Sequence, residues 1–141
     1  MKKEVVGLWG KGNVGKSQTI KKAYDLLKSR HKTVKEEYKI LGADVRVVLT
    51  INGTKIGIES QGDPGSRLEE SLLVFVKIKC TIIVCATRTR GQTVKAVENL
   101  QPDYEVLWLE QEVRSSVSEQ VASNNAMARR IVEEVENSIG V

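Results

Sequence analysis

Short apolar runs, each bounded by polar residues or glycines, divide the chain into alternating strands and helices. Three of these runs, residues 4–9, 80–86 and 104–110, are compact and rich in Val, Ile and Leu. Runs of this length and composition are typical of strands buried inside a covered sheet. A weaker pattern at residues 37–41 indicates a further short strand.

An alternating pattern predicts an antiparallel hairpin in the first half of the chain. Its centre is the pair Asn52-Gly53. Asn-Gly is the strongest short-range hairpin signal, because both residues readily adopt the positive φ of a type I′ turn. The apolar positions that alternate around this pair are Val45, Val47, Leu49, Ile51, Ile56 and Ile58.

Four segments carry the apolar spacing of amphipathic helices. The first spans residues 16–30, and the second begins after Ser66, with Glu69 at the spacing of a capping box. The third spans residues 91–100. The last is a long C-terminal helix, whose expected inward-facing residues are Val117, Val121, Ala128, Ile131 and Val135.

Strands that alternate with helices predict an α/β fold with a mostly parallel sheet. We expect a compact three-layer α/β/α arrangement with about five strands. The hairpin strand at residues 44–51 is expected to run antiparallel at one edge of the sheet. The length of 141 residues and the lack of repeats indicate a single domain over residues 1–141.

The composition is that of an ordinary globular domain, with 40% hydrophobic and 28% charged residues. No apolar run approaches the ~20 residues of a membrane span, and the run after the amino terminus is too short for a signal peptide. We therefore expect a cytoplasmic protein. Cys80 and Cys85 point to opposite faces of one predicted strand and are expected to be free, buried thiols.

The basic residues are concentrated near the amino terminus. Residues 1–39 hold 11 Lys and Arg against 4 acidic residues, whereas the rest of the chain holds 11 against 14. This excess suits a phosphorylated ligand. Nucleic acid is a less favoured partner, because aromatic residues are few and do not alternate with basic ones.

The stretch between the first strand and the first helix matches the phosphate-loop pattern G-x-x-x-x-G-K-[ST]. It reads Gly10, Lys11, Gly12, Asn13, Val14, Gly15, Lys16 and Ser17. Its glycines permit a turn whose N–H groups face an anion, and the helix that follows adds the positive end of its dipole. On these residues the chain resembles the P-loop NTPases.

The resemblance implies a role for each part of this loop. Lys16 would contact the β- and γ-phosphates, and the Ser17 hydroxyl would bind Mg²⁺. Gln18, the next residue of the helix, completes the predicted nucleotide-contacting stretch. The loop is also similar to the deviant loop of MinD/ParA-type ATPases, in which a lysine at the position of Lys11 reaches the nucleotide of a dimer partner.

A second segment supplies a candidate acid and a candidate switch. Glu59 ends the second hairpin strand, and Gly62 follows at E-x-x-G spacing, which resembles the D-x-x-G of small GTPases. The resemblance implies that Glu59 supports Mg²⁺ and that the Gly62 N–H senses the γ-phosphate. Asp63 is the competing candidate for the acid, and Gln61 is a candidate to orient the attacking water.

The segment after the strand at residues 80–86 bears on the choice of base. It reads Thr87, Arg88, Thr89 and Arg90, with no match to the guanine-reading N-K-x-D of GTPases. ATP is therefore the expected nucleotide, with GTP as the alternative. Arg88 and Arg90 are candidates to neutralise charge in the transition state, to stack on the base, or to bind a second phosphorylated substrate.

Together these features predict Mg²⁺-dependent binding of a nucleoside triphosphate with slow hydrolysis. One alternative is a nucleotide-dependent switch or assembly module, acting as a homodimer or through a protein partner. Another is a small-molecule kinase that uses Arg88 and Arg90 for its acceptor.

Overall fold

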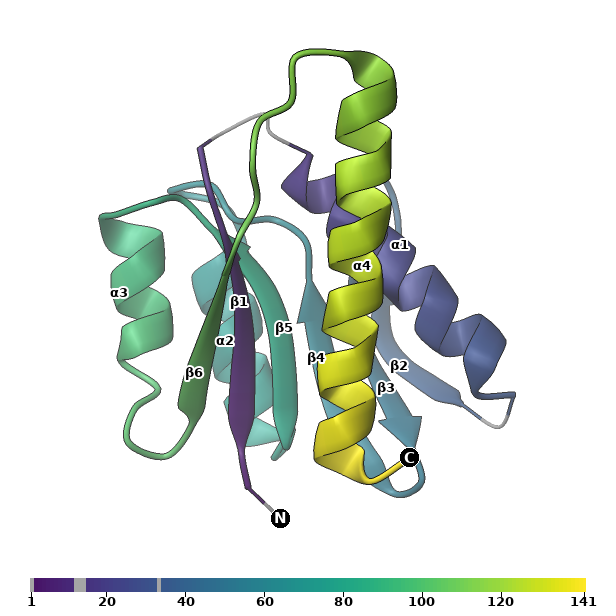
Figure 1. Cartoon of the computed structure of the whole chain (residues 1–141). Helices are drawn as coiled ribbons and strands as arrows, with labels where there is room; N and C mark the ends of the chain where they lie inside the picture. The colour runs from purple at the N-terminus through teal and green to yellow at the C-terminus, as the bar shows by residue number, and fades with distance from the viewer. Residues whose placement is uncertain (1, 12–14, 33) are drawn as a thin grey trace.

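The computed structural model describes residues 2–11, 15–32 and 34–141. These residues form a mixed six-stranded sheet and four helices (Figure 1). In chain order the elements are β1 (Glu4–Trp9), α1 (Lys16–Arg30), β2 (Lys35–Ile40), β3 (Arg46–Ile51), β4 (Thr54–Glu59), α2 (Leu68–Lys77), β5 (Ile82–Thr87), α3 (Gln92–Glu98), β6 (Glu105–Glu110) and α4 (Val117–Ile139).

The strand order is β2-β3-β4-β5-β1-β6, and the four strands from β4 to β6 are parallel. The prediction of an α/β fold is confirmed, but two details were wrong. The sheet has six strands rather than about five, and β3 is not at the edge, because β2 pairs antiparallel outside it. The further short strand indicated at residues 37–41 is present as β2, but its segment KEEYKI is mostly polar and largely exposed, so it lacks the apolar run that reveals a buried strand.

The predicted hairpin is confirmed in the strands β3 and β4. They pair antiparallel in register from Arg46↔Glu59 to Ile51↔Thr54. Asn52 and Gly53 both have positive φ, 51° and 78°. This is the backbone shape of a type I′ turn, for which Asn-Gly is the preferred pair.

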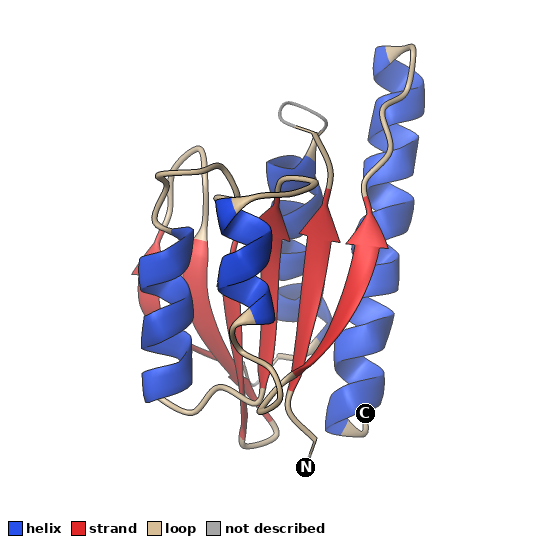
Figure 2. Ribbon diagram, turned by 90° about the vertical axis from the view of Figure 1, so that its left-hand side faces the viewer, coloured by secondary structure: helices blue, strands red, loops and turns tan. Residues whose placement is uncertain are grey.

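Helices cover both faces of the sheet (Figure 2). The helices α1 and α4 pack with one set of strand residues, including Val6, Ile58 and Val84. The helices α2 and α3 pack with the alternate set, including Val5 and Cys85. Successive side chains of a strand point to opposite faces, so each buried strand serves both cores.

The first turns of α4 extend beyond the carboxyl ends of the strands, as both views show (Figures 1 and 2). Val117 is therefore 82% exposed and Val121 is 51% exposed, although both were predicted to face inward. The prediction was correct for Ala128, Ile131 and Val135, which are buried. The apolar spacing is continuous along the helix, but the sheet that it covers is shorter than the helix.

The start of α2 also differs from the prediction. The helix begins at Leu68, and no side chain forms an N-cap hydrogen bond at its N-cap residue, Arg67. The side chain of Gln61 instead accepts a hydrogen bond from the Arg67 N–H at 3.0 Å. Ser66 Oγ accepts a longer hydrogen bond from the Leu68 N–H at 3.4 Å, so the predicted capping serine contacts the helix start together with Gln61.

None of the helices in the described part of the chain combines the length and apolar character that a membrane span needs.

Candidate functional site

A cleft of about 810 Å³ opens where the phosphate-loop stretch meets the carboxyl ends of the parallel strands. In open α/β sheets, ligands bind at this edge of the sheet. The residues that line the cleft come from α1, from the loops after β2 and β4, and from α4. They are Gly15, Lys16, Ser17, Gln18, Ala43, Asp44, Ser60, Gln61, Gly62, Asp63, Ser66, Val117, Gln120, Val121 and Asn124.

The described part of the predicted phosphate loop joins α1 through a left-handed glycine. Gly15 is the N-cap of α1 and has a φ of 89°, in the left-handed region that glycine adopts freely. A Cβ at Gly15 would lie 2.6 Å from the side chain of Asn124 on α4. Lys11 is exposed. The predicted contacts of Gly12, Asn13 and Val14 lie outside the described residues.

Lys16 lies at the meeting point of three segments. Its Nζ donates hydrogen bonds to the carbonyl oxygens of Gly10 and Thr87, each at 2.6 Å. The residue is only 7% exposed, and burial lowers its pKa to about 8. The nearby Asp63 raises the pKa and Arg88 lowers it, both by less than burial does.

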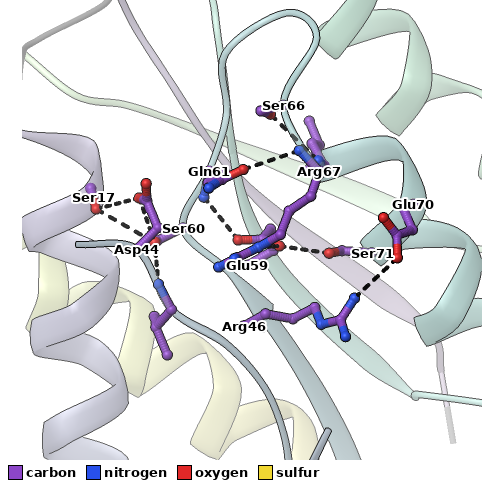
Figure 3. A network of polar contacts seen from close by, with 12 residues as sticks. Ser17, Asp44, Arg46, Glu59, Ser60, Gln61, Ser66, Arg67, Glu70 and Ser71 are labelled. Carbon is purple, nitrogen blue, oxygen red and sulfur yellow. Dashed lines mark hydrogen bonds and ion pairs between the residues drawn. The ribbon is translucent and has the colours of Figure 1, made fainter. Parts of the chain in front are cut away.

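Ser17 contacts an acid that sequence reasoning missed. Its Oγ donates to Asp44 Oδ1 at 2.7 Å, and Ser60 Oγ donates to the same oxygen at 2.8 Å (Figure 3). Ser60 Oγ also accepts a hydrogen bond from the Val45 N–H at 2.8 Å, which fixes the loop that carries Asp44. Asp44 comes directly before the alternating strand, and this position was a usable signal. The pairing of β3 with β4 places Asp44 at the carboxyl end of β4.

Glu59, the acid predicted to support Mg²⁺, is fully buried on the other side of this loop. Its Oε1 accepts from Arg67 Nε at 2.7 Å and from Ser71 Oγ at 2.6 Å, and its Oε2 accepts from the Gln61 N–H at 3.0 Å. Figure 3 shows this carboxylate directed toward α2, whereas Asp44 is directed toward Ser17. Glu59 therefore joins β4 to α2, and its assignment to the metal stays a prediction.

Gln61 and Gly62 continue the chain along the end of β5. The Gln61 side-chain oxygen accepts from the Arg67 N–H at the start of α2, and its role in orienting a water stays a prediction. A Cβ at Gly62 would lie 2.5 Å from the backbone carbon and oxygen of Ala86. Only glycine permits this close approach, which keeps the segment at the floor of the cleft.

Asp63 and Arg88 form an ion pair with an Nε–Oδ1 distance of 2.8 Å. Both side chains are substantially exposed, at 64% and 41%, so the pair contributes little to stability. The Arg88 N–H donates to Thr93 Oγ1 at 3.0 Å, which anchors the segment to α3. Arg90 and Gln18 are both exposed, and Gln18 lines the cleft.

The position of residues 87–90 in the sheet bears on whether they could identify the base of the nucleotide. β5 lies between β4 and β1, and Thr87 O accepts from the Gly10 N–H at 3.3 Å as well as from Lys16. The segment therefore lies beside the phosphate loop. β6, which leads into α4, lies on the other side of β1. Because residues 87–90 lie beside the phosphate loop, the absence of N-K-x-D there does not decide between adenine and guanine.

A buried amide pair connects the phosphate loop to α4. Thr19 Oγ1 donates to Gln111 Oε1 at 2.9 Å, and Gln111 Nε2 donates to Asn124 Oδ1 at 2.8 Å. All three residues are at most 9% exposed. Asn124, in turn, packs against Gly15. Sequence reasoning did not identify this chain of contacts, because its members are remote in sequence.

No protein-family model matches the chain, and no curated protein matches it at a significant level.

Proposed function

We propose that this protein binds a nucleoside triphosphate together with Mg²⁺ and hydrolyses it slowly, on a three-layer fold of the P-loop NTPase type. The observation that carries the proposal is the convergence of Lys16, Ser17 and Asp44 at one cleft. That cleft lies at the carboxyl edge of the sheet and directly after a left-handed glycine at a helix N-terminus.

The phosphates would lie at the start of α1. There the unpaired N–H groups and the helix dipole favour an anion. Lys16 is held by two carbonyl oxygens, and a bound triphosphate offers its ammonium group a stronger, charged acceptor. Movement of Nζ from these carbonyls to the phosphate is the first event that we expect on binding.

The residues around Ser17 fit a Mg²⁺ site. Mg²⁺ is usually held by one or two carboxylates, retained waters and phosphate oxygens, rather than by a cage of protein ligands. Asp44 supplies the carboxylate, with the hydroxyl groups of Ser17 and Ser60 on the same oxygen. Bound Mg²⁺ would neutralise charge on the β- and γ-phosphates. Asp44 thus replaces Glu59 and Asp63 as the acid that we assign to the metal.

We expect hydrolysis to be slow because the candidate catalytic side chains already have partners within the protein. Gln61 caps α2, and Asp63 pairs with Arg88. Gln61 must leave this partner before it can orient a water, and Arg88 must leave Asp63 before it can contact a phosphate at Lys16. The kinase alternative has less support, because no acceptor site is marked among the described residues.

ATP remains the nucleotide that we propose first. The cleft is lined by two carboxylates among the described residues, Asp44 and Asp63, and both lie near the phosphate end. Guanine recognition requires an acceptor for its N1–H and N2–H groups. The α4 residues that line the cleft include no carboxylate; they are Val117, Gln120, Val121 and Asn124. A switch or dimeric assembly role, in which Lys11 contacts a partner, stays a prediction, as does the cytoplasmic location.

The experiment is a calorimetric titration of the purified protein with ATP and GTP, with and without Mg²⁺. We expect Asp44→Asn to weaken Mg²⁺-dependent ATP binding about 10- to 100-fold while changing Mg²⁺-free binding much less. Ser66→Ala, at the cleft but remote from the Asp44 oxygen, is the matched control. Phosphate release should exceed that of a Lys16→Ala variant. Binding of neither nucleotide would refute the proposal.

A further inference from the structure

Two exposed valines on α4 form an apolar strip along one wall of the candidate cleft. Val117 is 82% exposed and Val121 is 51% exposed, and both line the cleft that also contains Gly15 to Gln18. They belong to the turns of α4 that project past the ends of the strands (Figure 1). Valine side chains left in water at this place require an explanation other than core packing.

The strip starts at the phosphate loop and leads away from it. Asn124 lies against Gly15, while Val121 and Val117 are three and seven residues earlier on the same helical face. A helix rises 1.5 Å per residue, so Val117 is about 10 Å from Asn124 along the axis. This is the scale of a nucleotide that extends from its phosphates across a ribose to its base.

The polar side chain beside the strip, Gln120, already has hydrogen-bond partners. The Gln120 amide donates from Nε2 to Asn124 Oδ1 at 2.9 Å and to Glu112 O at 3.2 Å, and its Oε1 accepts from the Arg114 N–H at 2.8 Å. These bonds hold the loop after β6 against the helix. The wall is therefore fixed in place and apolar, and its amide is not available to read hydrogen bonds of a base.

We propose that Val117 and Val121 are the base-binding wall of the cleft and that the face of a purine lies against them. The inference rests on the proposed function. A purine ring has an apolar face that gains from burial against methyl groups. Because the contact is apolar, adenine and guanine nucleotides should differ less than about tenfold in affinity, as one or two apolar contacts discriminate weakly.

A purine suits the strip better than a second copy of this chain does. The strip consists of two side chains within a concave site, and it is continuous with the place where the phosphates would bind. Stable protein interfaces bury about 800 Å² on each partner, which two valines do not provide. A small ligand in a cleft with a few apolar side chains is the arrangement that small-molecule sites share.

The test compares ATP with inorganic tripolyphosphate, which has the phosphates but no base, by calorimetry in the presence of Mg²⁺. The variant is the double substitution Val117→Ser and Val121→Ser, which removes methyl groups without adding charge. Val141→Ser is the matched control, because Val141 is 49% exposed and lies beyond the opposite end of α4. We expect about tenfold weaker ATP binding in the double variant, with tripolyphosphate binding unchanged within about twofold.

The outcomes separate this inference from the proposed function. If the unmodified protein binds both ligands but the double variant retains its ATP affinity, the base wall is wrong and the phosphate site stands. The same conclusion follows if ATP binds no better than tripolyphosphate, or if the serines change the oligomeric state instead. If the unmodified protein binds neither ligand, both proposals are wrong.

Discussion

Raising the pH should weaken ATP binding, because Lys16 loses its charge not far above neutral pH. Burial lowers the pKa of this lysine from its ordinary 10.5 to about 8 in the free protein. A triphosphate at the start of α1 would stabilise the charged form. The neutral side chain would therefore have to take up a proton when the ligand binds, and this linkage lowers the affinity at high pH.

The size of the effect follows from the pKa. With a pKa of about 8, roughly three quarters of the Lys16 side chains are charged at pH 7.5 and roughly 3% at pH 9.5. Affinity for Mg²⁺-ATP should therefore fall about 25-fold over this range if binding requires the charged form.

Folding stability should move in the opposite direction. The unfolded chain binds this proton more tightly than the folded one, so Lys16 adds to the free energy of unfolding as the pH rises from 8 toward 10.5. The contribution is fully present above pH 10.5 and is lost as the pH falls through 8. Weaker binding at pH 9.5 would thus not result from this group unfolding the protein.

The assay is calorimetry of Mg²⁺-ATP at several pH values from 7.0 to 9.5, together with an NMR titration of the Lys16 side-chain carbon next to Nζ. Lys16→Ala is the control, and it should bind weakly with little pH dependence in this range. A change of less than about threefold in the unmodified protein, or the same slope in Lys16→Ala, would show that this ammonium does not hold the phosphates.

Two substitutions test the other side of the cleft. Glu59→Ala should lower the free energy of unfolding by about 3 kcal/mol, measured by urea denaturation, because it leaves the Arg67 guanidinium beside a buried site without its carboxylate; if the folded variant instead loses its Mg²⁺ dependence, Glu59 and not Asp44 serves the metal. Gly62→Ala should destabilise the protein by about 1–3 kcal/mol, because its Cβ would lie 2.5 Å from the Ala86 backbone. Gly42→Ala, which meets no atom within 4 Å, should leave the melting temperature nearly unchanged.

The elements with strong local patterns could be predicted from the sequence. The β3–β4 hairpin has both an alternating pattern and a turn pair whose conformation is nearly specified by its two residues. β1 and β5 are apolar along most of their length because helices cover both sides of them. In these elements, local preference and burial favour the same structure, so the pattern is readable without tertiary information.

The remaining parts of the fold depend on contacts that a local pattern does not encode. β2 is mostly polar because it lies at the edge, and its pairing with β3 decides its conformation. Val117 and Val121 continue the apolar spacing of α4 after the sheet has ended. Spacing along a helix reports which residues share a face, but not whether anything covers that face.

The candidate site was predictable where residues are adjacent in sequence and not where strand order decides. Lys16 and Ser17 follow from a motif. Asp44 reaches Ser17 only because β3 and β4 pair in the observed register, and Glu59 turns away toward α2 because Arg67 and Ser71 lie there. Position at the end of a strand identified the loop at the cleft, but it did not identify Asp44, which comes from the other strand of the hairpin.

The central place of β1 in the sheet has a consequence for how the protein folds. The first strand pairs with β5 and β6, so that Glu4 lies beside both Ile82 and Glu105. Pairings this distant in sequence slow folding, because a long loop must close before they form. The amino-terminal strand can enter the sheet between its neighbours only after residue 110 is present. The start of α1 is thus synthesised before the strands on either side of β1, so ligand binding there would report completion of the whole sheet.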